Sequence, residues 1–293
     1  MKKIITLIII ILIVIPLGGC LKRDELENVT IYTTSYPIEY LTSILYGYNS
    51  DIKSIYPDGI DIKTYNLTSK QIKDYSKSSI FVYNGLTDEK QIAKNFVNKN
   101  NKIHIIDVSY GLKYDISVEE LWLSPNYYLM LSANIKNSLQ DFITNKYIKE
   151  EIDANYVIKL EEPLSLMDAG LHNLGEISKA ENRNTIIASS NVFKFLENYG
   201  FNVITLDDED NLTPNNLTNL KNDFKNGIYS HVFVRSDETV NELITDLKET
   251  YNAEIIVYNI MENLTDSQRK SNETYFTLMQ ENIENLKKVT IGK

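Results

Sequence analysis

The first twenty residues constrain this chain most, because they decide in which compartment the rest of it folds. Two lysines precede an almost unbroken apolar run from Ile4 to Leu17, and two glycines and Cys20 follow it. This run of 14 residues is shorter than the roughly 20 that a permanent membrane-spanning helix needs. The pattern therefore predicts a signal peptide over residues 1–19 that is removed from the mature protein.

Cys20 is the only cysteine in the chain, so it has no partner for an internal disulfide. Placed directly after Leu17-Gly18-Gly19, it resembles the lipidation site of bacterial lipoproteins, where the thiol takes a diacylglycerol and becomes the new N-terminus. Acyl chains at about 0.8 kcal/mol per buried CH₂ would hold such a protein on the membrane. The resemblance implies an extracytoplasmic protein anchored to the bacterial cell membrane. The alternative is an uncleaved anchor with an incidental cysteine.

The size and charge of the mature chain limit its class. Removing residues 1–19 from 293 leaves 274 residues, enough for two domains with a core each. It also takes two lysines from a formal charge of −10, which leaves −12. Such an acidic surface argues against nucleic acid as a partner and against broad adsorption to anionic lipid.

Short apolar runs alternate with helical patterns in both halves of the chain, which is typical of βα units and a mostly parallel sheet. Strands are expected in the first half at Val29–Thr34, Ile52–Tyr56, Ile80–Tyr83 and Ile103–Val108. In the second half they are expected at Thr185–Ala188, Asn202–Leu206, His231–Val234 and Glu254–Tyr258, with a last helix from about Asn272. The sequence predicts an α/β protein of two similar lobes.

A mostly helical stretch from Pro125 to Lys179 separates the two halves. Its first helix is expected over Tyr128–Ile143, and a longer one has apolar residues from Ile148 to Met167. Pro163 interrupts that longer pattern, so a kink is expected near residues 159–162. A long helix that joins two lobes would resist wide hinge opening. The expected organisation is a signal peptide (1–19), a tether (20–28), an N-terminal lobe (29–124), a helical connector (125–180) and a C-terminal lobe (181–293).

Several short motifs in this order resemble the solute-binding lipoproteins of zinc and manganese ABC importers. They are Thr33-Thr34-Ser35-Tyr36-Pro37, Pro57-Asp58-Gly59-Ile60-Asp61, Val82-Tyr83-Asn84-Gly85-Leu86, Leu121-Trp122-Leu123-Ser124-Pro125, Phe193-Lys194-Phe195-Leu196 with Tyr199-Gly200, and Leu264-Thr265. The resemblance covers nearly the whole mature chain. It implies two α/β lobes joined by a long backbone helix, a ligand in the cleft between the lobes, an ABC permease as partner, and a monomer without enzymatic activity.

In that family three histidines and a carboxylate hold a divalent metal, zinc or manganese, at the ends of strands, where α/β sheets place ligands. The matching positions in this chain are Lys63, Glu120, Ser190 or Asn191, Arg235 or Ser236, and Asn259. None is a histidine, and Glu120 is the one carboxylate among them. Zinc prefers His, Cys and carboxylate ligands, so Lys63 and Arg235 oppose a zinc ion at this site. The chain's own histidines, His104, His172 and His231, lie elsewhere and are expected to be structural.

Three interpretations of the cleft follow. In the first, Lys63, Glu120 and Arg235 form a charge cluster that closes the lobes and binds nothing. In the second, a net positive cleft, helped by helix N-termini near Asn191 and Asp237, selects a small anion or a zwitterion. In the third, carboxylates at residues 207–210 rebuild a metal site, although that run lacks the spacing of a calcium loop.

Two functions from different classes remain. The first is a tethered, extracytoplasmic receptor that delivers a solute or metal ion to an ABC permease, with an altered or lost metal site. The second is a surface adhesin on the same fold with no transported ligand. A secreted hydrolase has little support, because the sequence contains neither Gly-x-Ser-x-Gly nor His-Glu-x-x-His.

Overall fold

The N-terminal half of the protein forms a parallel four-stranded sheet. The structure is a computed structural model that describes residues 24–291. Its first sheet contains β1 (Thr30–Thr33), β2 (Asp51–Ser54), β3 (Ile80–Tyr83) and β4 (His104–Asp107) in the order β2-β1-β3-β4. Ile31 of β1 lies opposite Ile52 on one side and Ile80 on the other. All four residues of β3 are buried, as expected for a central strand covered on both faces.

The C-terminal half repeats this topology. Its sheet contains β5 (Thr185–Ala188), β6 (Asn202–Thr205), β7 (His231–Arg235) and β8 (Glu254–Tyr258) in the order β6-β5-β7-β8, again all parallel. In each sheet the chain adds its second strand on one side of the first and then crosses to the other side. Ligands of open α/β sheets bind outside the carboxyl ends of strands at such a crossing point. The predicted fold class, two similar parallel α/β lobes, is confirmed.

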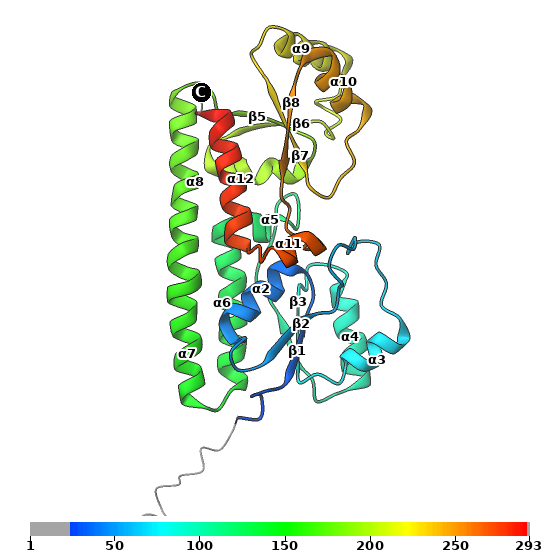
Figure 1. Cartoon of the computed structure of the whole chain (residues 1–293), viewed down its shortest axis with the longest axis vertical. Coiled ribbons are helices and arrows are strands. Elements are labelled where there is room, and N and C mark those ends of the chain that lie inside the picture. The colour runs from blue at the N-terminus through cyan, green and yellow to red at the C-terminus, as the bar shows by residue number, and fades with distance from the viewer. Residues whose placement is uncertain (1–23, 292–293) are drawn as a thin grey trace, which may run out of the picture.

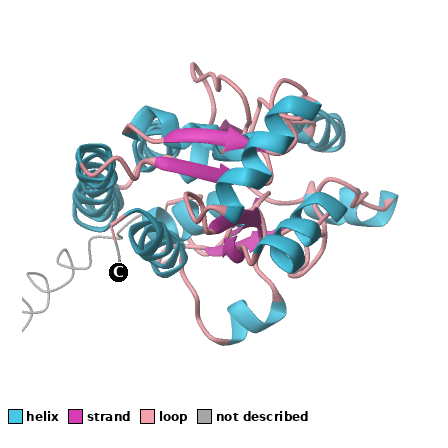
Figure 2. Ribbon diagram, turned by 90° about the horizontal axis from the view of Figure 1, so that it is seen from above, coloured by secondary structure: helices cyan, strands magenta, loops and turns pink. Residues whose placement is uncertain are grey.

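Helices cover both sides of the strands (Figure 2). Those of the first lobe are α2 (Tyr36–Tyr46), α3 (Ser69–Tyr75) and α4 (Glu89–Lys99). Those of the second lobe are the 3₁₀ helix η3 (Asn191–Tyr199), α9 (Pro214–Lys225) and α10 (Glu242–Tyr251). The chain ends with α11 (Asp266–Lys270) and α12 (Tyr275–Thr290). The last helix thus begins at Tyr275 and not at Asn272, which has a left-handed φ of 55°, and the short α11 was not predicted.

The connector comprises α5 (Glu120–Leu123), α6 (Pro125–Phe142), α7 (Lys146–Tyr156), η2 (Val157–Glu161) and α8 (Glu162–Ala180). Figure 1 shows α7 and α8 as one long rod that runs beside both lobes. Pro163 lies in the first turn of α8, and the π-helical turn η2 directly precedes it. Glu161 keeps helical angles, φ −61° and ψ −53°, so the helix continues through the turn. The predicted irregularity is present as a π turn, which is one way for a helix to accommodate a proline.

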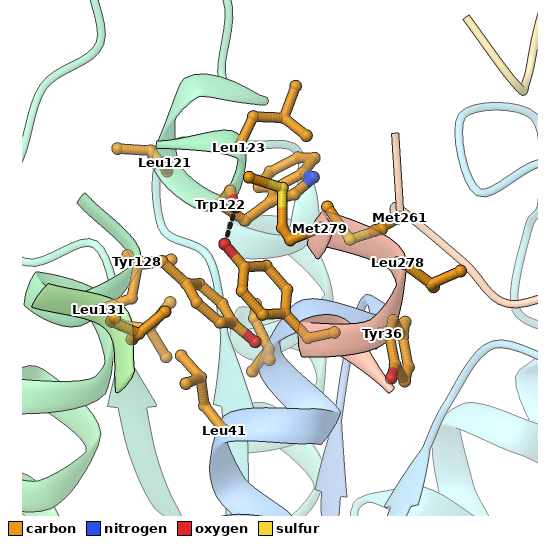
Figure 3. Close-up of a cluster of buried hydrophobic side chains, with 14 of the residues drawn as sticks. Tyr36, Leu41, Leu121, Trp122, Leu123, Tyr128, Leu131, Met261, Leu278 and Met279 are labelled. Carbon is orange, nitrogen blue, oxygen red and sulfur yellow. Dashed lines mark hydrogen bonds between the residues drawn. The ribbon is translucent and has the colours of Figure 1, made fainter. Parts of the chain in front are cut away.

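A buried cluster joins the connector to both ends of the chain (Figure 3). Trp122 of α5 donates from Nε1 to the carbonyl of Ile260 at 2.8 Å, and the hydroxyl of Tyr275 donates to the carbonyl of Trp122 at 2.7 Å. The ring of Tyr275 stacks on Tyr128 of α6 at 3.9 Å, and the Tyr128 hydroxyl donates to the carbonyl of Pro37 at 2.7 Å. This cluster fixes the two lobes to the same connector.

The segment between β8 and α12, residues 259–274, crosses back to the first lobe. We call it the return segment. The backbone N–H of Tyr36 donates to the carbonyl of Glu262 at 3.1 Å, and that of Gly59 donates to the carbonyl of Leu264 at 2.7 Å. The guanidinium of Arg269 pairs with two carboxylates of the first lobe, Glu39 at 2.8 Å and Asp58 at 2.9 Å. The expected C-terminal lobe, 181–293, therefore includes a part that packs on the N-terminal lobe (Figure 1).

The N-terminal end of the described chain also differs from the expected tether of residues 20–28. Asp24 and Leu26 are buried. The Asp24 carboxylate accepts hydrogen bonds from the backbone N–H groups of Thr144, at 2.6 Å, and Asn145, at 2.9 Å. Residues 24–28 therefore belong to the folded body. The predicted signal peptide and Cys20 lie outside the described residues. Within residues 24–291, no helix is both long and apolar enough to cross a membrane.

Candidate functional site: a charged cleft between the lobes

A cavity of about 460 Å³ lies between the two lobes. Its upper wall comes from residues at or just after the ends of β5, β6 and β7 of the second lobe, among them Ser189, Asp207 and Arg235. Its lower wall comes from the loop after β2, which carries Lys63, and from Glu262 of the return segment. The cavity thus lies where the strand topology predicts a ligand site.

Four charged side chains from three parts of the chain form an ionic bridge across this cleft. We use that name for Lys63, Glu119, Arg235 and Asp237. Glu119 Oε1 lies 3.0 Å from Lys63 Nζ and 3.5 Å from Arg235 Nη2. Arg235 forms a two-pronged pair with Asp237, with Nε at 2.7 Å from Oδ1 and Nη2 at 2.5 Å from Oδ2. One carboxylate therefore ties a cation of the first lobe to a cation of the second.

The pairing decides the charge states of these groups. Burial raises the pKa of Glu119, but the hydrogen bond from Ser117 and the charge of Lys63 outweigh it and hold the pKa below its usual value. Burial likewise raises the pKa of Asp237, and the stronger opposing effect of Arg235 leaves this pKa lowered as well. Both carboxylates are therefore ionised at neutral pH, and the ionic bridge is fully charged.

The residue that faces the cleft is Glu119 and not the predicted Glu120. The Glu120 carboxylate accepts backbone hydrogen bonds from Ile116 at 2.9 Å, Ser117 at 3.1 Å and Asp115 at 3.2 Å, so it holds the turn that precedes α5. The adjacent carboxylate, Glu119, instead contacts Lys63 and Arg235, which line the cavity. Two acidic neighbours give no sequence signal for which one turns inward, because the orientation of the four-residue α5 decides it.

The other matching positions shape the site through short local bonds. Ser190 caps η3 by accepting from the backbone N–H of Val192 at 3.3 Å. Asn191 accepts from the Thr205 hydroxyl at 3.1 Å. The Ser236 hydroxyl accepts from the backbone N–H of Ile260 at 3.1 Å. The side chain of Asn259 accepts from the backbone N–H of Met261 at 2.9 Å and so fixes the start of the return segment. Of these, Ser190 and Ser236 line the cavity.

The expectation of a net positive cleft is wrong. The cavity is lined by two basic residues, Lys63 and Arg235, and by five acidic ones, Asp61, Asp207, Asp237, Glu238 and Glu262. The helix N-termini do not attract a foreign anion either. The backbone N–H of Asn191 already donates to the carboxylate of Asp207 at 2.9 Å. The second helix, α10, begins at Glu242, and its cap Asn241, which lines the cavity, already accepts from the backbone N–H of Ile244 at 3.0 Å.

No group of three or more His, Cys, Asp and Glu side chains suited to a metal ion is found within residues 24–291. His104 packs on the Phe142 ring at 4.4 Å, His172 lies 3.7 Å from Asp168, and His231 lies 3.3 Å from Glu254. None of them is a residue of the cleft cavity. Two carboxylates of the 207–210 run that were candidates for a metal have other partners: Asp207 holds η3, and Asp208 pairs with Lys194 at 2.8 Å.

Two buried acids near the cleft have strongly raised pKa values. Burial raises the pKa of Glu89 to about 7, although the backbone N–H of Asn84 donates to its carboxylate at 2.7 Å. Burial also raises the pKa of Glu262 to about 7, against the opposing charge of Lys63. No local sequence pattern indicates either of these acids, because the burial of an acid depends on the packing of distant segments.

We expect Glu89→Gln to flatten the stability of the protein against pH. The folded pKa of Glu89 exceeds its ordinary value of 4.5, so the folded state holds an extra proton between about pH 5 and 7 and loses stability as the pH rises through that window. A rise from 4.5 to about 7 corresponds to up to about 3 kcal/mol. The neutral amide keeps an acceptor for Asn84. Urea unfolding at pH 5 and pH 8 measures the effect, and an equal pH dependence in wild type and variant would contradict it.

Comparison with known proteins places the chain in a family. The sequence model described as "Zinc-uptake complex component A periplasmic" matches residues 31–289. The zinc-binding protein AdcA of Streptococcus pyogenes serotype M3 is 23% identical over 298 residues, which cover 90% of this chain and 56% of AdcA. The manganese ABC transporter substrate-binding lipoprotein PsaA of Streptococcus anginosus is 23% identical, and 98% of each chain is covered. AdcA, the first curated relative, is the longer protein, and this chain spans little more than half of its length.

Solved structures agree with this fold. The Zn(II)-bound ZnuA-like domain of AdcA from Streptococcus pneumoniae superposes with a TM-score of 0.73 at 20% identity and covers 91% of this chain and 100% of the domain. The laminin binding protein Lmb of Streptococcus agalactiae, described as bifunctional with adhesin and metal transporting activity, gives a TM-score of 0.69 at 16% identity and covers 90% of this chain and 100% of Lmb. The family match extends across both lobes, from β1 to the end of α12, and on this ground the chain belongs to the zinc-uptake complex component A family.

Proposed function

We propose that this protein is the extracytoplasmic solute-binding component of a metal-type ABC importer, anchored to the membrane through Cys20, and that its cleft no longer holds the family's metal. The family consists of solute-binding components of transporters and not of enzymes. The single observation that carries the altered site is the ionic bridge. Lys63 Nζ and Arg235 Nη2 lie 3.0 Å and 3.5 Å from Glu119, where two protein cations do the charge pairing that a metal would do.

Electrostatics supports this proposal. A divalent cation bound by Glu119 would lie close to an ammonium and a guanidinium, and like charges at such distances repel strongly where the surroundings are partly desolvated. The remaining acids of the cavity are spread over several elements, and all of them except Glu262 have hydrogen-bond partners in the protein. The rest of the fold, with two lobes, a rigid connector and a cavity at the strand ends, keeps the form of a solute receptor.

Elemental analysis of the full mature chain, purified without an affinity tag, tests the metal part of the proposal. We expect no stoichiometric zinc or manganese, and melting curves that do not change with Zn²⁺, Mn²⁺ or EDTA. A metal at 100 times its dissociation constant would add about 2.7 kcal/mol of stability, which such curves detect. One metal per chain that is lost in Glu119→Gln would contradict the proposal.

The transport part needs a separate test. We expect the lipidated protein to purify from detergent-solubilised membranes together with a permease and its ATPase subunit. Purification without either, combined with binding to host matrix proteins, would favour the adhesin alternative instead. In the described residues no specific feature favours an adhesin.

A further inference from the structure

One carboxylate of the cleft cavity has no hydrogen-bond partner within residues 24–291. The other acids that line the cavity are engaged: Asp237 by Arg235, Asp207 by the backbone of Asn191, Asp61 by its own turn through the backbone of Lys63 at 2.9 Å, and Glu238 by the backbone of Arg235 at 2.9 Å. For the Glu262 carboxylate, the nearest charged partner within the described residues is Lys63 Nζ at 3.9 Å, beyond hydrogen-bond range. Its side chain is 17% exposed. A largely buried carboxylate without a donor is costly unless a ligand supplies one.

A second polar group in the same cavity is also without a partner. Ser189 follows β5, is 6% exposed and lines the cavity. Its hydroxyl oxygen is buried and has no hydrogen-bond partner among the described residues. Buried hydroxyls in folded proteins are almost always hydrogen-bonded. The unpartnered Glu262 carboxylate and this unpartnered hydroxyl lie at one cavity, and the carboxylate, which is partly exposed, is the group that a ligand in the cavity can reach.

The size and charge of the cavity limit the kind of ligand. Its volume of about 460 Å³ lies in the range of pockets for small organic molecules, whereas a metal ion needs ligands converging within about 2.0–2.6 Å. Glu262 is the one acid of the cavity lining that has no hydrogen-bond donor among the described residues, so a ligand that carries a positive charge together with hydrogen-bond donors fits it.

We propose that the cleft binds a small organic solute through a protonated primary amino group, which pairs with the Glu262 carboxylate. This inference rests on the proposed function in one respect, namely that the cleft is a solute site. Simple amines and amino acids share this chemistry. An amino acid would also place its carboxylate near Lys63, whose side chain is 51% exposed and pairs with Glu119 at 3.0 Å.

The proton equilibrium of the site gives a further signature. Burial raises the pKa of Glu262 to about 7, so the group carries a proton part of the time in the empty cleft. An ammonium ligand favours the ionised form and must displace that proton. Binding should therefore strengthen as the pH rises from about 6 to 8. The charged groups that face Glu262 are Lys63, Arg235, Glu119, Asp237 and, from the first lobe, Glu89.

Isothermal titration of the full mature chain with ethanolamine and with glycine tests the proposal. We expect saturable binding of at least one of them with one site per chain. Glu262→Gln should weaken it about tenfold or more, because a charge-assisted hydrogen bond is lost. Ser189→Ala should weaken it less. Asp74→Asn, which removes an exposed carboxylate on α3 far from the cavity lining, is the matched control and should bind as wild type does.

Comparing glycine with ethanolamine distinguishes an amino acid from a simple amine as the ligand. Tighter binding of glycine, with Lys63→Gln weakening glycine but not ethanolamine, identifies an amino acid; equal binding identifies a simple amine. Acetate and tetramethylammonium, which lack the amino N–H groups, should not bind. No binding of either amine, or equal binding by Glu262→Gln, overturns the inference. Binding of one Zn²⁺ that Glu262→Gln abolishes also overturns it and leaves the receptor role intact. Failure of the permease to co-purify overturns that role without changing the amine result.

Discussion

Replacing Gly175 with alanine is expected to destabilise the protein by about 3 kcal/mol or more. Gly175 lies in α8, and a Cβ atom built there would come within 1.7 Å of the carbonyl oxygen of Tyr199. That oxygen belongs to the backbone at the end of η3 and cannot rotate away as a side chain can. Gly200 follows with a left-handed φ of 90°, so the turn has little freedom to move. The long connector helix would have to separate from the second lobe.

Gly170 provides a control in the same helix. A Cβ atom at this position meets no atom within 4 Å. Gly170→Ala should therefore stabilise the protein by about 0.5–1 kcal/mol, since alanine is the better helix former. Both variants carry the same glycine-to-alanine change in the same helix, so urea unfolding followed by circular dichroism compares the two positions directly. Similar unfolding midpoints for Gly170→Ala and Gly175→Ala would show that α8 does not approach η3 as closely as described.

Removing the arginine of the ionic bridge should cost about 3–5 kcal/mol at neutral pH. The side chain of Arg235 is only 13% exposed, and Arg235→Ala leaves Glu119 without its link to the second lobe and Asp237 without its cation. The pKa values of both carboxylates are lowered in the folded protein, so their pairing stabilises the fold above their ordinary pKa values and loses this effect as the pH falls. The destabilisation should therefore shrink toward pH 4.

Lys77→Ala is the matched control for this prediction. Lys77 and Asp74 also form an ion pair, at 2.7 Å, but their side chains are 66% and 45% exposed. Exposed pairs contribute about 0–1 kcal/mol, so this variant should unfold almost as wild type does. Thermal melts at pH 7 and pH 4 measure both variants. A loss in Arg235→Ala as small as in Lys77→Ala would mean that the bridge is a surface contact with little energetic weight.

The sequence predicted the lobes well because their signals are local. Short β-branched runs separated by helical patterns give eight strands within one or two residues of their observed bounds, and a parallel sheet follows from the helices between them. The position of the connector's irregularity was also predictable, since proline acts on the turn that precedes it. That this irregularity is a π turn depends on packing along both lobes and could not be read locally.

The details of the cleft could not be predicted, since they depend on contacts between distant segments. Asp207 neutralises the start of η3, and Glu262 reaches the cavity only because the return segment crosses to the first lobe. A local pattern contains neither fact. The inward turn of Glu119 in place of Glu120 is a matter of one residue in a four-residue helix, below the precision of any sequence pattern.

The return segment also determines when the first lobe can finish folding. Asn263 bonds to Pro57 across 206 residues, and the N–H groups of Tyr36 and Gly59 find their acceptors in the same late segment. Under the proposed export, which delivers a chain N-terminus first, these groups of the first lobe would stay unsatisfied until almost the whole chain has crossed the membrane. A chain truncated before residue 260 would leave even its first lobe incomplete.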